Sequence, residues 1–379
     1  MSMRTAVRRV AAPPARIAMR SLVAARTRRW APASRLFALG ERSGWSVDED
    51  AAFLEAAARR LGYEVGPSDW ARFCGHQAVF HSSHFEALTP RWLESSHRLA
   101  TAYLHGRPGT PGYPEFDRAF ERLRLAPHRF SRVQVTHGEL QELVLSADVE
   151  PSHVHLIRIG IDLAHFPLVR PELRARARAE LGVPGGAFVV GSFQKDGVGW
   201  QEGLVPKLVK GPDILISALE QLRSDAPELF VLLTGPARGF VRRELERLGI
   251  PYRHDFARTR AELARAYHAL DVYVVASRQE GGPKAALESM AAGVPFVTTR
   301  VGQAQELVED GRNGLLADVE DAEALAALAA RVREDADLGN RLRAEGRVTA
   351  EAHEYERLDS AWDALLTGFV ERRSAVDGR

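Results

Sequence analysis

The stretch SRQEGGPKAALE, residues 277–288, places two carboxylates at the two ends of a Gly-Gly turn. The apolar run before it, Val272–Ala276, is typical of a buried strand. The residues after the proline are strong helix formers and end at Gly293, a common helix terminator. The stretch therefore predicts a strand, a turn and a helix, with Glu280 in the turn and Glu288 on the helix.

This turn has the chemistry of an anion site that also binds hydroxyl groups. Gly281 and Gly282 let backbone amides approach a ligand closely, and Pro283 suits the first helical position because its missing N–H is not needed there. A helix N-terminus attracts anions, and carboxylates accept hydrogen bonds from hydroxyls. We therefore expect the ligand to be a polyol that carries a phosphate.

Strands and helices alternate strictly in the second half of the chain. This pattern predicts an α/β fold with a parallel sheet covered on both faces, and ligands of such sheets bind at the carboxyl ends of the strands. The expected strands are 188–193, 229–234, 251–254, 272–276 and 296–299, and the expected helices are 212–222, 240–248, 260–269, 283–292 and 322–334.

The first half is a less regular α/β region. We expect a helix over 49–61 and strands at 36–39, 63–65, 78–81, 99–104, 133–136 and 154–159. The predicted organisation is a basic leader over 1–34, a first domain over 35–165, a linker over 166–186, a second domain over 187–350, and a C-terminal helix and tail over 351–379. Within the last part, 355–370 is expected to be an amphipathic helix.

Charge is distributed unevenly along the 379 residues. Residues 1–40 contain nine Arg and no acid, whereas the remaining 339 residues carry 42 basic and 50 acidic side chains. The leader has three interpretations: a disordered tail, an interfacial segment that binds anionic membrane, or an organellar transit peptide. A single cysteine, Cys74, excludes an internal disulfide and fits a reducing compartment, so a cytoplasmic location is expected. The membrane interpretation adds peripheral contact with the inner membrane face.

A second glycine-rich loop follows the strand 188–193. It carries Lys195 and then Lys207 and Lys210, and lysines at that end of a sheet can neutralise phosphate. Taken alone, the loop could equally be a solvated basic surface. Its position at the same predicted sheet edge as Glu280 favours the phosphate interpretation.

Metal chemistry is not expected. His81 and His84 have the wrong spacing for two ligands on one strand face, and no third ligand stands near them. The acids of 48–50 are interpreted as a helix start favoured by the helix dipole. His105 and His137 each end an expected strand, and either could be a capping or solvated histidine.

Taken together, these segments resemble a known family. EGGP at 280–283 followed by ESMAAGVPFV at 288–297 looks like the E-x7-E signature of glycosyltransferase family 4, within the glycosyl transferases group 1. Further similarity lies in 154–162, 302–306 and 311–315. The resemblance implies the GT-B fold, two Rossmann-like domains that face each other across a cleft. It also implies retaining transfer of a sugar from a nucleotide-diphosphate donor, with no metal cofactor.

The resemblance also assigns roles to residues. Glu280 would contact the donor sugar as a catalytic residue, with Gly281, Gly282 and Pro283 lining the donor site, and Glu288 would bind the ribose diol. The family's basic pair would fall on Ser192 and Lys210, so Lys195 is the candidate substitute for the arginine missing at position 192. His105 would lie near the sugar and the acceptor, and the loop 40–45 replaces the family's acceptor-side Gly-Gly loop.

The expected activity is that of a hexosyltransferase in polysaccharide biosynthesis, with a glycan, a lipid-linked molecule or a small molecule as acceptor. No nucleic-acid partner is expected. The alternatives are a GT-B sugar-nucleotide epimerase or phosphorylase, and a non-catalytic protein that binds a sugar nucleotide. The sequence names neither the sugar, the nucleobase nor the acceptor.

Overall fold

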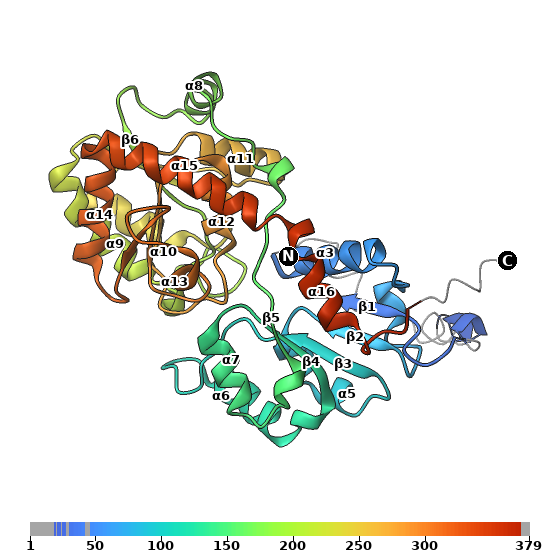
Figure 1. Ribbon diagram of the computed structural model, residues 1–379. Coiled ribbons are helices and arrows are strands. Elements are labelled where there is room, and N and C mark those ends of the chain that lie inside the picture. The colour runs from blue at the N-terminus through green and yellow to red at the C-terminus, as the bar shows by residue number, and fades with distance from the viewer. Residues whose placement is uncertain (1–18, 20, 24, 28–29, 42–45, 373–379) are drawn as a thin grey trace.

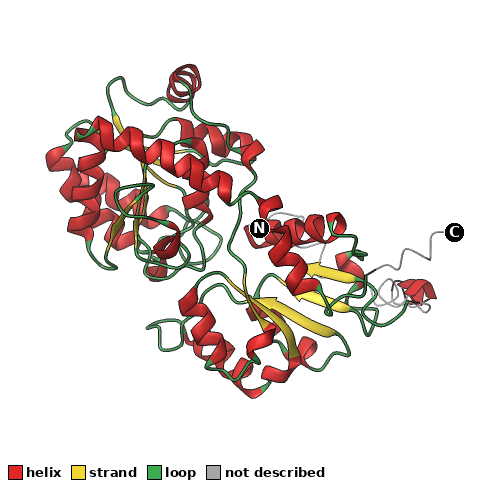
Figure 2. Ribbon diagram, in the orientation of Figure 1, coloured by secondary structure: helices red, strands yellow, loops and turns green. Residues whose placement is uncertain are grey.

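The protein consists of two α/β domains that lie side by side, each built around one parallel sheet (Figures 1 and 2). The computed structural model describes residues 19–372, except for 20, 24, 28–29 and 42–45. The loop 40–45 therefore lies mostly outside the described residues, as does most of the leader.

The first sheet has five strands in the order β1-β2-β3-β4-β5. Its elements are β1 (Leu36–Leu39), α3 (Ser46–Arg60), β2 (Ala78–His81), α4 (His84–Ala87), α5 (Pro90–Leu93), β3 (Arg98–Ala102), α6 (Pro114–Leu125), β4 (Phe130–Val135), α7 (Gly138–Leu145) and β5 (Val154–Leu156). The strand expected at 63–65 is wrong. Val65 makes only an isolated bridge to Leu36, because the chain turns away at Pro67 into a short 3-10 helix, Ser68–Trp70.

The second sheet has six strands in the order β11-β10-β9-β6-β7-β8. Its elements are β6 (Phe188–Ser192), α9 (Pro212–Asp225), β7 (Leu229–Leu233), α10 (Gly239–Leu248), β8 (Tyr252–His254), α11 (Arg260–His268), β9 (Val272–Val275), α12 (Lys284–Ala292), β10 (Phe296–Thr299), α13 (Ala304–Leu307), β11 (Leu315–Ala317), α14 (Ala322–Glu334) and α15 (Ala336–Ala352). The expected alternation is confirmed; β11, α13 and α15 were not predicted.

The end of the leader is part of the first domain, which corrects its interpretation as a disordered segment up to residue 34. Trp30 stacks on Trp70 at 6.0 Å and approaches Phe37 at 6.4 Å. Ala33 is fully buried and its amide donates to the carbonyl of His76 at 2.6 Å. Trp30 therefore contributes to the core of this domain instead of to a membrane-binding face.

The chain crosses between the domains twice. The first crossing follows β5, since Ile157 packs in the core of the first domain and Ile161 in that of the second. The second crossing follows α15, and the two segments are joined where Ile161 exchanges hydrogen bonds with His353 and Tyr355, both at 3.0 Å.

The C-terminal segment returns to the first domain (Figure 1). The helix expected over 355–370 is broken into a 3-10 helix, Tyr355–Leu358, and the short helix α16 (Asp359–Leu366). α16 buries Trp362 against Phe80 at 6.0 Å. Residues predicted as linker also pack: α8 (Pro171–Glu180) lies against α11 of the second domain.

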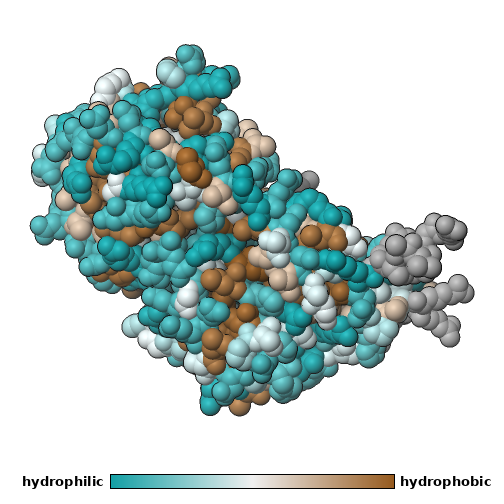
Figure 3. All heavy atoms as spheres, in the orientation of Figure 1, coloured by the Kyte–Doolittle hydropathy of each residue, from teal (hydrophilic) through white to brown (hydrophobic). Residues whose placement is uncertain are grey.

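Hydrophobic side chains gather where the two lobes meet on the face shown in Figure 3. Every helix that can be followed in the described part of the chain is too short or too polar to cross a bilayer.

Candidate functional site

The turn after β9 places Glu280 at the carboxyl edge of the second sheet. Its Oε2 accepts from Lys210 Nζ at 2.6 Å, and its Oε1 accepts from the Ser277 hydroxyl at 2.8 Å. The Glu280 side chain is only 9% exposed. Glu280 and Lys210, seventy residues apart in sequence, are thus brought together as the sequence predicted.

Two glycines permit the close packing around this turn. A Cβ on Gly211, where φ is +58°, would lie 1.8 Å from the Ala276 carbonyl oxygen. A Cβ on Gly281 would lie 1.9 Å from the carbonyl oxygen of Leu104, in the first domain. The Gly281 carbonyl also accepts from the Thr136 hydroxyl at 2.6 Å. The Gly-Gly turn is therefore pressed against the strand ends of the opposite domain, and Gly282 lies beside Ile159 at the first crossing.

Glu288, on α12, is buried and held at both oxygens. Its Oε2 accepts from the Tyr267 hydroxyl at 2.9 Å, and its Oε1 accepts from Arg260 Nη1 at 3.1 Å. Burial raises the pKa of Tyr267 well above its usual value, so its hydroxyl stays a donor. Glu288 nevertheless keeps lone pairs for two further hydrogen bonds, because a carboxylate offers about four acceptor positions.

Lys207 is the one of the three loop lysines to which the family resemblance assigned no role. Burial, with Lys210 as the next cause, lowers its pKa to about 8, while Glu280 opposes the shift. Lys195, the predicted substitute, lies with Nζ 4.2 Å from the centre of the Trp200 ring, and burial lowers its pKa too. The signal for Lys207 was its place three residues before Lys210-Gly211.

The loop between Lys195 and Lys207 is a hairpin-like flap. Val198 and Val205 pair through a 2.8 Å amide hydrogen bond, and Lys207 donates its amide to the Asp196 carbonyl at 2.7 Å. At its base, Asp196 and Arg238 form a fully buried ion pair at 2.9 Å. These contacts tie the two ends of the loop, which carry Lys195 and Lys207, to each other and to Arg238.

Arg238 contacts Ser192, the position at which the family's arginine is missing, but it does not replace that arginine. Its Nη1 donates to the Ser192 carbonyl at 2.6 Å and its Nη2 to the Ser192 hydroxyl at 3.2 Å. The guanidinium is fully buried and neutralised by Asp196, so its role is structural.

His105 faces this basic cluster from the other domain. Burial lowers its pKa well below the usual value, with further contributions from His84, Lys210 and Lys207. The ring packs against Phe85 at 5.6 Å and Phe116 at 5.8 Å. His105 is thus a neutral imidazole opposite Lys207 and Lys210, at the position that the sequence predicted.

Of the other singled-out histidines, His81 and His84 lie in the interior of the first domain, whereas His137 lies at its boundary with the second domain, near Gly281 and Glu306. Burial lowers the pKa of His81 and of His84 to about 3, and His84 stacks on Tyr103 at 4.0 Å. His137 precedes α7 as its N-cap residue and lies buried beside the Thr136 hydroxyl at 3.1 Å. Among the described residues, we find no group of three His, Cys, Asp or Glu that could hold a metal ion.

The N-terminus of α12 also faces the opposite domain. Pro283 is its N-cap residue, one position before the first helical residue, Lys284. Lys284 Nζ contacts Asp50 Oδ1 at 2.7 Å and Glu49 Oε2 at 3.3 Å. Asp48 and Glu49 lie in the first turn of α3, as predicted, and Glu49 and Asp50 also form ion pairs with basic side chains of the second domain.

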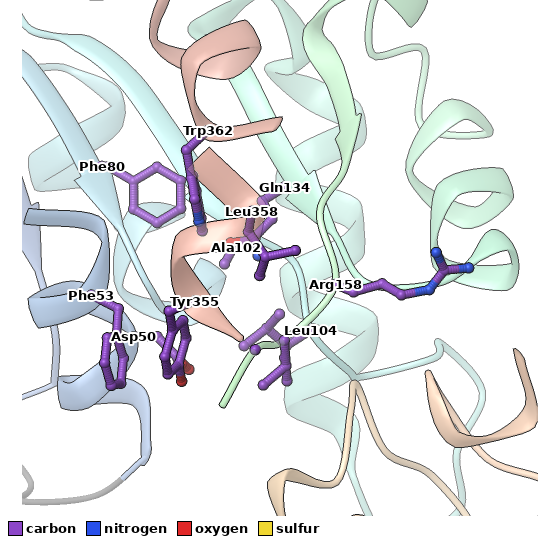
Figure 4. A pocket seen from close by; sticks show the side chains of 12 residues that line it. Asp50, Phe53, Phe80, Ala102, Leu104, Gln134, Arg158, Tyr355, Leu358 and Trp362 are labelled. Carbon is purple, nitrogen blue, oxygen red and sulfur yellow. The ribbon is translucent and has the colours of Figure 1, made fainter. Parts of the chain in front are cut away.

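Two cavities lie outside this cluster. One, of about 20 Å³, is lined by aromatic side chains at the domain junction: Phe53 stacks on Tyr355 at 3.3 Å, and Phe80 meets Trp362 (Figure 4). It has room for one water molecule and not for a sugar. The other, of about 430 Å³, lies between α8 and α11, and its lining includes none of the predicted site residues.

Solved structures with the same architecture define the fold. Anabaena HepE, determined with UDP and glucose, superposes with a TM-score of 0.70 at 18% identity, covering 88% of this chain and 99% of that chain. Sucrose-phosphate synthase from Thermosynechococcus elongatus gives 0.62 at 21% identity, covering 86% and 79%. The chain has the GT-B fold, as predicted.

The part of the chain that matches a family model lies in the second domain. Residues 205–349 match the model of glycosyl transferases group 1. D-inositol 3-phosphate glycosyltransferase from Arthrobacter sp. is 33% identical over 207 residues, which are 52% of this chain and 45% of the relative. The Corynebacterium jeikeium enzyme of that name is 30% identical over 242 residues, 61% and 55%. The predicted resemblance to group 1 glycosyltransferases is confirmed, and the chain spans about half the length of the curated relatives it matches.

Proposed function

We propose that this protein is a retaining glycosyltransferase that uses a nucleotide-diphosphate sugar. The observation that carries the proposal is the meeting of Glu280, Lys207 and Lys210 at one sheet edge, with Glu288 on the following helix and His105 opposite them. UDP-sugars are the first donors to test, because HepE was solved with UDP and with UDP-glucose.

In this proposal the second domain binds the donor. Glu288 accepts hydrogen bonds from the ribose diol, and Glu280 accepts them from sugar hydroxyls. Lys207, Lys210 and the N-terminus of α12 stabilise the negative charge that grows on the diphosphate as it leaves. Lys195 is close enough to Lys207 to lower its pKa and is a further diphosphate candidate.

The chemical step exchanges one bond for another on the same face of the sugar. The bond from the anomeric carbon to the diphosphate oxygen breaks, and a bond to the acceptor hydroxyl oxygen forms. The acceptor proton passes to an oxygen of the leaving diphosphate, so no enzyme nucleophile is required. The neutral His105 side chain positions the reacting sugar and the acceptor from the first domain.

The proposed acceptor is a hydroxyl of a glycan, a lipid-linked molecule or a small polyol. Inositol 3-phosphate should be among the first acceptors tested, because the relatives from Arthrobacter and Corynebacterium are named for it. The cytoplasmic location, the peripheral membrane contact and the role in polysaccharide biosynthesis are also proposals.

The direct test is nucleoside diphosphate release from UDP-glucose and other nucleotide sugars, measured with and without the acceptor panel. Acceptor-dependent release and a product with the donor's anomeric configuration are expected. Conversion of the donor without an acceptor would favour an epimerase, dependence on inorganic phosphate a phosphorylase, and binding without turnover a non-catalytic role. Activity should survive EDTA; loss that Mg²⁺ or Mn²⁺ restores would contradict the metal-free site.

A further inference from the structure

Arg260 is shared by two carboxylates from different domains. Its Nη1 donates to Glu288 Oε1 at 3.1 Å, and its Nη2 contacts Glu49 Oε1 of α3. The three side chains are partly or largely buried, with 29% of Arg260, 31% of Glu49 and 9% of Glu288 exposed. An ionic chain therefore runs from the first domain, through α11, to the carboxylate that we assign to the ribose.

Glu288 has little acceptor capacity to spare. One of its about four lone-pair positions takes the Tyr267 hydroxyl and a second takes Arg260, which leaves about two for a ribose diol. Arginine binds an accessible carboxylate preferentially through two parallel hydrogen bonds. If Nη2 were released from Glu49, Arg260 could make such a two-point pair with Glu288 and remove one of the positions that the diol needs.

We propose that Glu49 is a positioning residue for the donor site, which acts from the opposite domain by holding Arg260 away from a two-point pair with Glu288. The inference rests on the proposed function, because it assigns Glu288 to the nucleotide. It makes the donor site dependent on the first domain, although the assigned nucleotide-binding residues all belong to the second.

Glu49 is well placed for this role. Its other oxygen lies 3.3 Å from Lys284 Nζ, and the neighbouring Asp50 binds the same amine at 2.7 Å. Asp50 therefore continues to hold Lys284 across the cleft when only Glu49 is changed. A Glu49→Gln substitution keeps the size of the side chain and removes the charge that attracts Arg260.

The test is calorimetric titration of the full chain with UDP, repeated with GDP, ADP, CDP and TDP. We expect Glu49→Gln to raise the dissociation constant of the nucleotide that binds by about tenfold, the scale of one hydrogen bond to a charged group. In Glu49→Gln/Arg260→Gln, Arg260 can no longer compete, so affinity should return to within about threefold of the original chain. Glu55→Gln is the matched control, because it lies on the same helix and pairs with Arg59.

The rescue distinguishes positioning from general structural support, which a second substitution would not restore. The inference is overturned if Glu49→Gln binds as tightly as the original chain, or if the double variant binds no better than Glu49→Gln. The Glu288→Gln variant distinguishes failure of the inference about Glu49 from failure of the proposed function. If Glu288→Gln leaves nucleotide affinity unchanged, the assignment of Glu288 to the ribose is wrong as well. If the unmodified chain binds none of the five nucleotides, both proposals fail.

Discussion

The two sides of the domain junction at the candidate site, the donor wall on the second domain and the facing wall on the first, are encoded in different ways. On the second domain, Glu280 and Glu288 come from one strand-turn-helix segment and Lys207 and Lys210 from another, so each contribution is local in sequence. On the first domain, His105 and Glu49 reach the cleft from elements separated by two strands of the sheet. The donor wall can thus be recognised from short motifs, whereas the facing wall depends on tertiary packing.

The largest effect should follow from changing the centre of the donor wall. Glu280→Gln removes the charge paired with Lys210 at 2.6 Å and the acceptor proposed for sugar hydroxyls. We expect the transfer rate to fall about 10²- to 10³-fold, the scale of one lost transition-state contact. The rate of nucleoside diphosphate release with acceptor present measures it. A rate within threefold of the unmodified chain would remove Glu280 from the site.

The facing wall should affect turnover without affecting donor affinity. His105→Asn keeps a polar side chain and removes the imidazole opposite Lys207 and Lys210. We expect kcat to fall about 10²-fold, in the range of a positioned polar catalytic group. UDP affinity should stay within about twofold. An equal loss of UDP affinity would show that donor binding and turnover are not separated between the second and the first domain.

The leader offers a structural test of the first domain. Removing residues 1–33 deletes Trp30 and Ala33, which pack on Trp70, Phe37 and His76. We expect a loss of about 2 kcal/mol, seen as a thermal midpoint lowered by about 5 °C. UDP binding should persist, because the donor residues lie in the other domain. An unchanged midpoint would contradict the packing role of Trp30.

A shorter deletion separates packing from membrane attraction. Removal of residues 1–18 leaves Trp30 in place and takes away four of the nine arginines. We expect an unchanged midpoint but weaker co-sedimentation with anionic vesicles at low salt, because each basic residue near such a surface contributes up to about 1 kcal/mol. If the full chain ignores these vesicles, the membrane interpretation should be dropped.

The smallest expected effect is the pH dependence of UDP affinity, which involves only the donor wall. Burial lowers the pKa of Lys207 to about 8, so the free protein loses this charge as pH rises through 8. The proposed contact with the diphosphate requires the protonated amine, so UDP affinity should fall between pH 7 and 9, by at most about tenfold. Lys207→Arg should abolish the decline, because arginine stays charged. A decline unchanged in that variant would assign it to another group.

Most strands and helices of the second domain could be predicted from the sequence because apolar runs and helix-forming segments alternate regularly there. Apolar runs with helix formers and glycine stops between them located its inner strands, and the E-x7-E spacing located Glu280 and Glu288. The short strand β11 and the helix α15 were missed because neither is set off by such signals. Val65 was assigned to a strand on composition alone, although Pro67 ends its pairing after one bridge.

The site residues that escaped prediction depend on distant contacts. Lys207 is noteworthy only because folding brings it beside Lys210 and Glu280 and lowers its pKa. Glu49 looked like an ordinary helix-start acid, and its contact with Arg260 spans more than two hundred residues. Trp30 lies in the segment interpreted as a leader, and its packing on Trp70 and Phe37 becomes visible only in the folded chain. Neither the contact of Glu49 with Arg260 nor the packing of Trp30 is contained in a local pattern.

The two chain crossings determine how the domains can move. The Ile161 amide donates to the His353 carbonyl and the Ile161 carbonyl accepts from the Tyr355 amide, so one parallel bridge joins the two crossings, which are not independent tethers. We expect any relative motion of the two lobes to pivot at this joined pair of crossings, so that closing the domains would bring Glu49 back to Arg260 and His105 back to the lysines.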